Sequence, residues 1–269
     1  MRNWTLKGIA AGKATTDWPY PDDLDNGQER MRGFPKFDPS RCETSCQACI
    51  DICPTAALST NRSEDIASNV QLDFGKCINC QICIETCPTD ALQNSADFMF
   101  AAKNRNDLIR SQQPVTEAAD RLRSKIEKHF KGSLHVRHID AGSCNGCESE
   151  LAATTNPYYN LHRLGIFFTP SPRFADVLLV TGTVVPQMIG PLQRTYQAMP
   201  NPKFVIAGGT CSISGAPFDF GYAAGNGADP FLPVDVYLPG CPPSPASFIF
   251  ALLLLTERVE QKLKDGNYE

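Results

Sequence analysis

Twelve cysteines are the residues of this sequence whose type and spacing point most directly to chemistry. Eight lie between Cys42 and Cys87, and four lie between Cys144 and Cys241. Thiolates are ligands of zinc and of iron–sulfur clusters. A disulfide framework is the other common use, but disulfide-rich chains are short and secreted, and residues 1–8 carry no apolar signal segment. The pattern therefore indicates a cytoplasmic protein whose reduced thiols bind metal.

The first eight cysteines form two similar runs. The second run, Cys77-x2-Cys80-x2-Cys83-x3-Cys87-Pro88, has the spacing of bacterial two-cluster ferredoxins. In such runs three cysteines hold one cluster and the fourth reaches the cluster of the other run. Two zinc sites fit poorly, because zinc usually draws on well-separated Cys-x2-Cys pairs. The predicted ligands are Cys42, Cys46, Cys49 and Cys87 for the first 4Fe–4S cluster and Cys53, Cys77, Cys80 and Cys83 for the second.

The first run departs from this spacing at one point. Three residues separate Cys42 from Cys46 where two are expected, and Glu43 occupies the expected position. We predict that the loop Glu43-Thr44-Ser45 bulges and that Cys42 still reaches iron, because one extra residue in an irregular loop costs little closure entropy. The alternative is a free Cys42, beside a cluster that has three thiolate ligands or has lost an iron.

The last four cysteines follow segments with the composition of β-strands. Cys144 and Cys147 follow the first segment, Cys211 the third and Cys241 the fourth. In an open parallel sheet the carboxyl ends of the strands meet at one edge, so these four thiols are expected to form one site. This pattern alone allows zinc, an iron–sulfur cluster or scattered buried cysteines. The predicted strands are residues 134–139, 176–180, 203–207 and 234–238.

The rest of the sequence is organised around these two groups. An extended arm rich in proline, glycine and aspartate is predicted for residues 1–40. An α+β ferredoxin-like two-cluster module follows at 41–93, and its repeated halves indicate duplication. A helical connector is predicted for 94–133, with an apolar stripe within 116–132. The alternation of strands with helical stretches predicts an α/β flavodoxin-like parallel-sheet domain at 134–269.

Composition gives no reason to expect nucleic acid or direct insertion into a membrane. The net charge is −4, with 42% hydrophobic and 20% charged residues. The longest apolar run, Phe248–Leu255, is too short to span a bilayer, so membrane attachment is expected only through partners. The dispersed histidines are predicted to be structural; they are His129, His135, His138 and His162.

At the C-terminal cysteines the sequence also resembles a known family. Residues 133–265 are similar to the small subunit of membrane-associated, energy-converting NiFe hydrogenases, including formate hydrogenlyase, and to the related subunit of respiratory complex I. The N-terminal part resembles the ferredoxin subunit of that complex, so the chain looks like a fusion of two subunits. The complex I subunit carries adjacent cysteines where this chain has Cys144-x2-Cys147, which favours the hydrogenase branch. The motifs that carry the resemblance are Gly142–Glu148, Pro170–Gly182, Tyr196–Lys203 and Pro233–Pro243.

The resemblance implies an oxidoreductase subunit with three 4Fe–4S clusters. The third cluster, held by the C-terminal cysteines, is expected nearest to a NiFe centre in a separate large subunit, on the cytoplasmic side of the membrane. The twelve cysteines are then all ligands, so no catalytic residue is expected in this chain. Glu148 is a candidate for a role beside the partner's active site or in proton movement, and Arg173 for pairing with a partner carboxylate or with the negative charge of the cluster. A helix N-terminal acid and a surface arginine are the alternatives. A quinone-reducing, complex I-like assembly and a zinc-stabilised scaffold are the rival functions.

Overall fold

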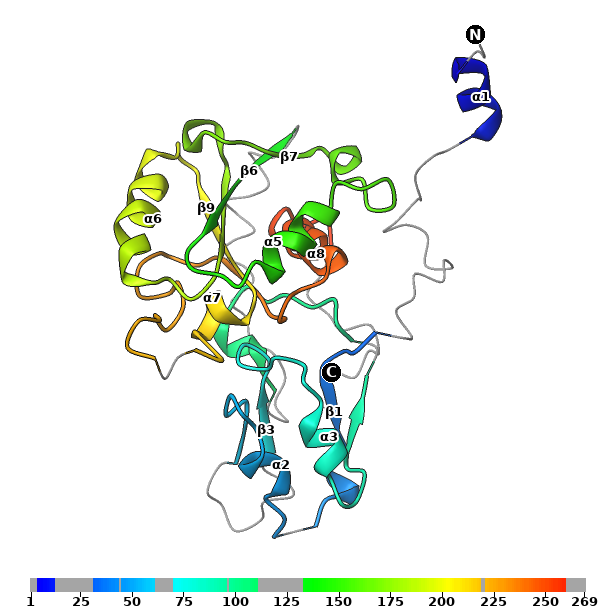
Figure 1. The fold of residues 1–269 in the computed structure, drawn as a ribbon, viewed down its shortest axis with the longest axis vertical. Coiled ribbons are helices and arrows are strands. Elements are labelled where there is room, and N and C mark those ends of the chain that lie inside the picture. The colour runs from blue at the N-terminus through cyan, green and yellow to red at the C-terminus, as the bar shows by residue number, and fades with distance from the viewer. Residues whose placement is uncertain are drawn as a thin grey trace.

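The computed structural model consists of two groups of elements, an N-terminal module and a larger C-terminal domain (Figure 1). A short helix α1 (Trp4–Ala11) precedes them. The helix predicted within 116–132 and most of the predicted arm lie outside the described residues. The structure describes residues 4–12, 31–43, 45–60, 70–95, 97–110, 133–218 and 221–259.

The C-terminal domain is built on a five-stranded parallel sheet. The strand order is β7-β6-β8-β9-β10, and every neighbouring pair is parallel. In chain order this is 2-1-3-4-5, which is an order of doubly wound sheets. The edge strand β7 was not predicted, because three residues carry no alternating pattern. The strands are β6 (Leu134–Asp140), β7 (Ile166–Phe168), β8 (Val177–Thr181), β9 (Phe204–Gly208) and β10 (Val236–Leu238).

Helices cover both faces of this sheet. α5 (Gly146–Ala153) and α8 (Pro245–Leu255) pack on one face, and α6 (Pro186–Ala198) packs on the other (Figure 1). All residues of β8 and β9 are buried, as expected for central parallel strands covered on both sides. Every residue of α8 is buried as well, so the apolar run noted in the sequence is a core helix.

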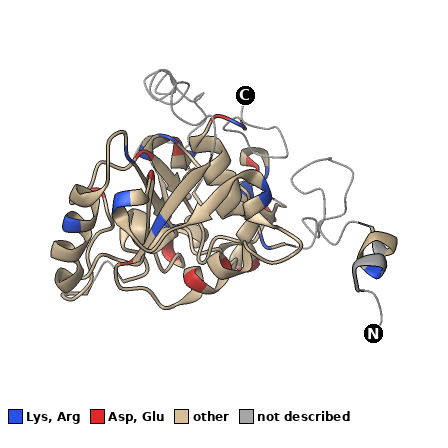
Figure 2. Cartoon of the chain, turned by 90° about the horizontal axis from the view of Figure 1, so that it is seen from above, with Lys and Arg blue, Asp and Glu red and all other residues tan. Residues whose placement is uncertain are grey.

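Helix length and the distribution of charged residues bear on whether the chain could enter a membrane or bind a strongly charged partner. In the described part of the chain, no helix has the length and apolar character needed to cross a membrane. Acidic and basic residues are interspersed over the elements drawn in Figure 2. This mixture of signs agrees with the small net charge of −4.

The N-terminal module contains two small antiparallel sheets and two short helices. β1 pairs with β4, and β3 lies between β2 and β5. The helices α2 and α3 contact each other and occupy equivalent places in the two cysteine runs. The elements are β1 (Pro35–Phe37), η2 (Pro39–Arg41), α2 (Ala48–Asp51), β2 (Leu58–Thr60), β3 (Val70–Asp73), α3 (Ile82–Thr86), β4 (Leu92–Asn94), η3 (Arg105–Leu108) and β5 (Ile109–Arg110).

Phe34 and strand β1, at the start of the module, pack into its core, although the sequence placed them in the extended arm. Phe34 is 2% exposed, and its ring centroid lies 4.6 Å from that of Phe74. Strand β1, which falls within the predicted arm, pairs with β4. A three-residue strand flanked by glycine and proline has no periodicity to reveal it in the sequence.

The segment 97–110 joins the module to the C-terminal domain. Ala102 exchanges two backbone hydrogen bonds with Tyr237 of β10, with N···O distances of 2.9 and 2.8 Å. The Ser247 hydroxyl of α8 donates to the carbonyl of Phe98 at 3.0 Å. The end of the same segment is β5, which completes the sheet of the module. One core of buried residues therefore includes Phe74 from the module and Ile213 from the domain.

An ion pair fixes this segment to the module. Arg105 donates from Nη1 to Asp73 Oδ1 at 2.9 Å and from Nη2 to Asp73 Oδ2 at 2.6 Å. The two side chains are 24% and 14% exposed. Gly75 also donates its backbone N–H to Asp73 Oδ1. A bidentate pair in such a half-buried place stabilises more than an exposed single contact does.

We expect Arg105→Met to lower the midpoint of thermal unfolding of the cluster-loaded protein. The lost charged hydrogen bonds correspond to about 1–3 kcal/mol. The matched control is Arg41→Met, which removes an exposed pair with Asp38 at 3.3 Å and is expected to have almost no effect. Equal shifts in the two variants, measured by differential scanning calorimetry, would contradict the structural role of Arg105.

Candidate iron–sulfur centres

The C-terminal cysteines lie at one edge of the parallel sheet. Cys144 and Cys147 come after β6, at the start of α5. Cys211 lies in α7 (Thr210–Ser214), directly after β9, and Cys241 follows β10. The carboxyl ends of three strands thus deliver four thiols to the edge where parallel sheets usually bind ligands.

The thiols of this group are close enough to repel one another as thiolates. Burial raises the pKa of the Cys147 thiol, and Glu148 and the other three cysteines raise it further. Burial, with repulsion from Cys241 and Cys144, raises the pKa of Cys211 to about 12. Without metal the thiols of Cys147 and Cys211 stay protonated at neutral pH, so metal binding to them must release protons. Four convergent sulfurs are the donor set that a 4Fe–4S cluster requires.

The backbone around these cysteines needs glycine at two points. Gly209 has φ +90°, and a Cβ placed on it would lie 2.8 Å from the Cys147 sulfur. Gly240 has φ +140°, and a Cβ there would lie 2.7 Å from Cα of Pro243. Positive φ and close approach both favour glycine. These glycines let the loops after β9 and β10 close around the sulfur atoms.

Exposure differs strongly within the group. Cys147 is 8% exposed, whereas Cys144 and Cys241 are exposed at the surface. Their neighbours Asn145 and Pro242 are also exposed. The centre therefore lies at the surface of the chain, with one side buried against the sheet and the other open to approach.

The second cysteine run forms a similar group in the N-terminal module. Burial raises the pKa of Cys77 to about 12, and repulsion from Cys83, Cys53 and Cys80 adds to it. Burial raises the pKa of Cys83 to about 11, again with contributions from Cys80 and Cys53. The structure thus brings together the four cysteines predicted for the second cluster.

Three cysteines of the first run lie close together despite its extra residue. Burial raises the pKa of Cys49 to about 12, followed by repulsion from Cys42, from Cys83 and from Cys46. Cys42 is therefore close to the group, as the predicted bulge requires, although Thr44 of that loop lies outside the described residues. The fourth predicted ligand, Cys87, follows α3 and packs against the same core.

The backbone beside the cysteines differs between the two runs. Gln81 follows Cys80 with φ +64°, whereas Gln47, its counterpart after Cys46, has φ −120°. The difference lies directly after the longer Cys42–Cys46 loop, in a stretch that has the same length in both runs. The halves are alike again from the helices α2 and α3 onward.

The fourth cysteine of each run is held in a nest of hydrogen-bond donors. Burial by itself would raise the pKa of Cys53, but backbone N–H groups of Leu58, Thr55 and Ala57 lower it. The N–H of Ala57 donates to the Cys53 sulfur at 3.3 Å. Such bonds stabilise a thiolate and tune a cluster bound to it.

The second run repeats this nest residue by residue. Around Cys87 the donors are the N–H groups of Leu92, Thr89 and Ala91, which lower its pKa against the effect of burial. Hydroxyl oxygens also approach the sulfurs, with 3.8 Å from Cys53 to Thr55 and 3.9 Å from Cys87 to Thr89. Sequence analysis missed both threonines. The repeated Cys-Pro-Thr-x-Ala-Leu was the signal that could have found them.

The arrangement of the thiols also bears on the kind of metal group. Among the described residues, no three His, Cys, Asp or Glu side chains converge tightly enough to hold a single ion. A cubane cluster places its thiolates on four different iron atoms, so its ligands need not meet at one point. The C-terminal group and the group around Cys77 each supply four thiols, which is the donor type and number of a 4Fe–4S cluster.

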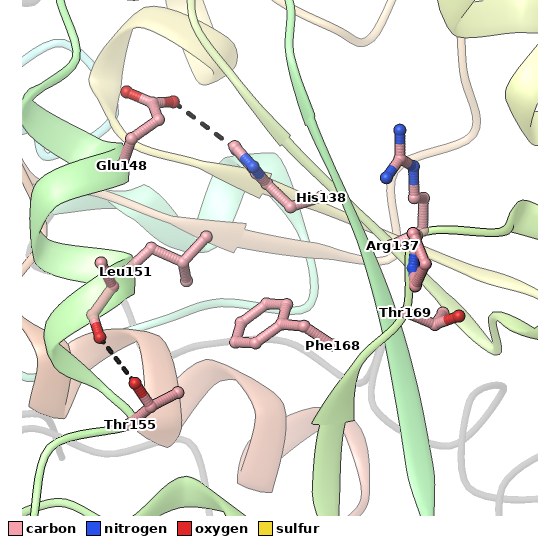
Figure 3. Close-up of a pocket in the computed structure, with 9 residues that line it drawn as sticks. Arg137, His138, Glu148, Leu151, Thr155, Phe168 and Thr169 are labelled. Carbon is pink, nitrogen blue, oxygen red and sulfur yellow. Dashed lines mark hydrogen bonds and ion pairs between the residues drawn. The ribbon is translucent and has the colours of Figure 1, made fainter.

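Glu148 is held by side chains of its own domain. Ser143 donates to Glu148 Oε2 at 2.7 Å, Thr181 donates to Oε1, and His138 Nε2 lies 3.5 Å from Oε1. Figure 3 shows Glu148 of α5 and His138 of β6 facing each other beside a pocket of about 420 Å³, which Arg137 also lines. Glu148, in the first turn of α5, therefore accepts hydrogen bonds from two hydroxyl groups of its own domain. His138 is part of this network.

Arg173 lies far from the C-terminal cysteines. It is exposed in η5 (Pro172–Phe174), just before β8 begins. The cysteine loops lie beyond the opposite ends of the strands, and five residues of strand span about 16 Å. A direct pairing of Arg173 with a cluster at those cysteines does not fit this geometry. Its exposure leaves contact with another protein open to it.

Fold and thiol groups together define an iron–sulfur protein in which a two-cluster module is joined to an α/β domain with its own cysteine site. Residues 41–91 match the family of 4Fe–4S dicluster domains. Residues 144–255 match the family described as the 20 kDa subunit of NADH ubiquinone oxidoreductase. These matches confirm the resemblance drawn from the sequence.

The chain is also similar to particular proteins. Over 149 residues it is 42% identical to formate hydrogenlyase subunit 7 of Escherichia coli (strain K12), a match that covers 55% of this chain and 58% of that protein. The chain thus spans just over half the length of that relative. It is 31% identical to a chain of the membrane-bound sulfane sulfur reductase, an archaeal respiratory membrane complex, covering 52% of this chain and 77% of that one. The TM-score there is 0.41, and no conclusion rests on that superposition.

We expect Cys42→Ser to perturb one cluster and leave the others unchanged, because Cys42 lies beside Cys49 in the first group. The measurement is electron paramagnetic resonance of anaerobically prepared protein, whose native form should give only 4Fe–4S signals. An oxidised 3Fe–4S signal in the native protein that Cys42→Ser leaves unchanged would indicate that Cys42 is not a ligand.

We also expect Thr55→Val and Thr89→Val to lower the reduction potentials of different clusters. A donor to sulfur stabilises the more negative reduced state, so its loss lowers the potential, here on the order of tens of millivolts. Thr55→Val should affect the cluster of Cys53, and Thr89→Val that of Cys87. Each variant controls for the other in a potentiometric titration. A shift of the same signal in both would contradict the crosswise ligand sets.

Proposed function

We propose that this chain relays electrons through three 4Fe–4S clusters to or from the NiFe centre of a partner large subunit. The observation that carries the proposal is the C-terminal thiol group, in which Cys144 and Cys241 are exposed while Cys147 is buried. A cluster held there would be buried on the side of Cys147 and would reach the surface on the side of Cys144 and Cys241. A partner that covers this surface would bring its own redox centre close.

The ligand sets follow from the three groups of cysteines. Each set has four thiols, and together they use all twelve. When bound, the clusters supply one-electron redox chemistry. The protein holds them through thiolates, buries one side of each and donates hydrogen bonds to sulfur, as in the nests around Cys53 and Cys87. No substrate-converting residue is assigned to this chain.

The folds of the two parts agree with this function. We assign the ferredoxin-like fold to the N-terminal module on its internal repeat, and the flavodoxin-like fold to the C-terminal domain on its strand order. The proposed division into domains keeps the boundaries near 41–93 and 134–269, with β1 added to the module. Attachment to the cytoplasmic face of a membrane, through partner subunits, is part of the same proposal.

A quinone-reducing assembly of the complex I type is the second candidate. The family match to the 20 kDa subunit is the observation in its favour. The spacing Cys144-x2-Cys147 and the similarity to a formate hydrogenlyase subunit favour the hydrogenase type. Nickel in the large subunit of the purified complex would decide for hydrogenase, and its absence for the alternative.

We expect the anaerobically purified chain to be brown and to contain about twelve irons, as three 4Fe–4S clusters require. Dithionite should reduce it, while no hydrogen uptake should occur without the partner. Cys241→Ser should leave the two ferredoxin-type signals intact and abolish electron delivery to the partner. Zinc in place of iron, or hydrogen uptake by the chain alone, would overturn the proposal.

A further inference from the structure

Thr210 stands at the contact between the two domains and is 1% exposed. It is the first residue of α7 and directly precedes Cys211. Its hydroxyl lies 3.0 Å from the carbonyl oxygen of Cys77, which belongs to the N-terminal module. The same hydroxyl lies 3.1 Å from the carbonyl oxygen of Gly240, which precedes Cys241.

One side chain therefore touches the backbone at three proposed cluster ligands. Thr210 is bonded covalently to Cys211, and its N–H and hydroxyl both point at the carbonyl next to Cys241. The hydroxyl has one hydrogen and two carbonyl acceptors at nearly equal distances. Because the site is buried, water cannot replace either hydrogen bond without cost. The contact is fixed in place by both domains.

The two ferredoxin-type groups are not equivalent in this respect. Cys77 opens the second run and faces α7 through its own carbonyl. Its counterpart in the first run is Cys42, which is half-buried between the exposed residues Arg41 and Glu43. The duplicated module thus presents one of its two halves to the C-terminal domain and leaves the other directed elsewhere.

We propose that Thr210 is the positioning residue of an electron-transfer junction between the second ferredoxin-type cluster and the C-terminal cluster. The inference rests on the proposed function and specifies its route. One electron leaves the reduced cluster of Cys77, which is oxidised, and reduces the oxidised cluster of Cys211; no bond forms or breaks and no proton moves. The connection runs from Cys77 through its carbonyl and the Thr210 hydroxyl to Cys211. The cluster of Cys42 is then the outermost of the three.

A second contact between the domains provides a matched control. The Ser214 hydroxyl, also on α7, donates to the carbonyl of Gly75 at 2.9 Å. Gly75 is packed tightly, since a Cβ on it would lie 2.9 Å from the side chains of Arg105 and Ile213. Neither Ser214 nor Gly75 is a proposed ligand. The Ser214 hydroxyl also lies 3.2 Å from the carbonyl oxygen of Thr210, one turn earlier in α7. Removing it weakens the same interface but leaves the Thr210 hydroxyl and its contact with Cys77 in place.

The experiment compares Thr210→Val, Thr210→Ser and Ser214→Ala in the full-length, cluster-loaded chain. Valine keeps the shape of threonine and removes the hydroxyl, whereas serine keeps the hydroxyl. The ferredoxin-type clusters are reduced by a flash-generated one-electron donor, and freeze-quenched samples report when the C-terminal signal appears. We expect a severalfold delay in Thr210→Val, native kinetics in the other two variants, and unchanged reduction potentials and iron content in all three.

The outcomes separate this inference from the proposed function. Native protein without three clusters would overturn the proposed function. Native protein with three clusters, and a Thr210→Val variant that transfers electrons at the native rate, would overturn the inference alone. An equal delay in Ser214→Ala would overturn it too, because any loosening of the interface would then suffice.

A second measurement tests the order of the clusters and does not use the Thr210→Val variant, so it can be made even if that variant does not bind its clusters. In the native protein, reduced throughout, magnetic coupling to the cluster of Cys80 should broaden the electron paramagnetic resonance signal of the C-terminal cluster. Cys80→Ser should therefore remove this broadening. Cys46→Ser, the equivalent change in the first run, should leave it unchanged. Loss of the broadening in Cys46→Ser alone would reverse the order of the clusters and overturn the route.

Discussion

The structure depends on bringing mutually repelling thiols together in three places. Burial and the neighbouring cysteines raise the pKa of Cys147 and Cys211, and the same holds for Cys49 and Cys77 in the module. Such convergence is unfavourable for thiolates by themselves and becomes favourable when a metal group binds them. The fold has to hold these loops close, and the positive-φ glycines and the short helices that contain Cys49, Cys83, Cys147 and Cys211 serve that end.

The two domains meet these demands by different means. In the module a duplicated loop and helix carries most of the cysteines locally, and the fourth cysteine of each run sits in its own nest of N–H groups. In the C-terminal domain the cysteines come from segments nearly a hundred residues apart, and the parallel sheet brings them together. The first arrangement is encoded in spacing, and the second is encoded in topology.

The interface between the domains is formed by both backbone and side-chain hydrogen bonds. Segment 97–110 adds a backbone bridge to β10 and a strand to the module, while α7 contacts the module through two hydroxyls. Segment 97–110 packs into the cores of both domains and thereby holds their cysteine groups in a fixed arrangement.

The sequence by itself determined the local chemistry: the cysteine runs, their shifted first member and four of the five strands of the sheet, because spacing and periodicity are local properties. It did not reveal β1 or β7, which are too short to have a period. It also placed Glu148 and Arg173 near a partner or cluster. Only the tertiary structure decided that Glu148 faces His138 and Thr181, and that Arg173 lies at the opposite end of the sheet. The junction at Thr210 was likewise beyond the sequence, since contacts between domains depend on how separate elements pack.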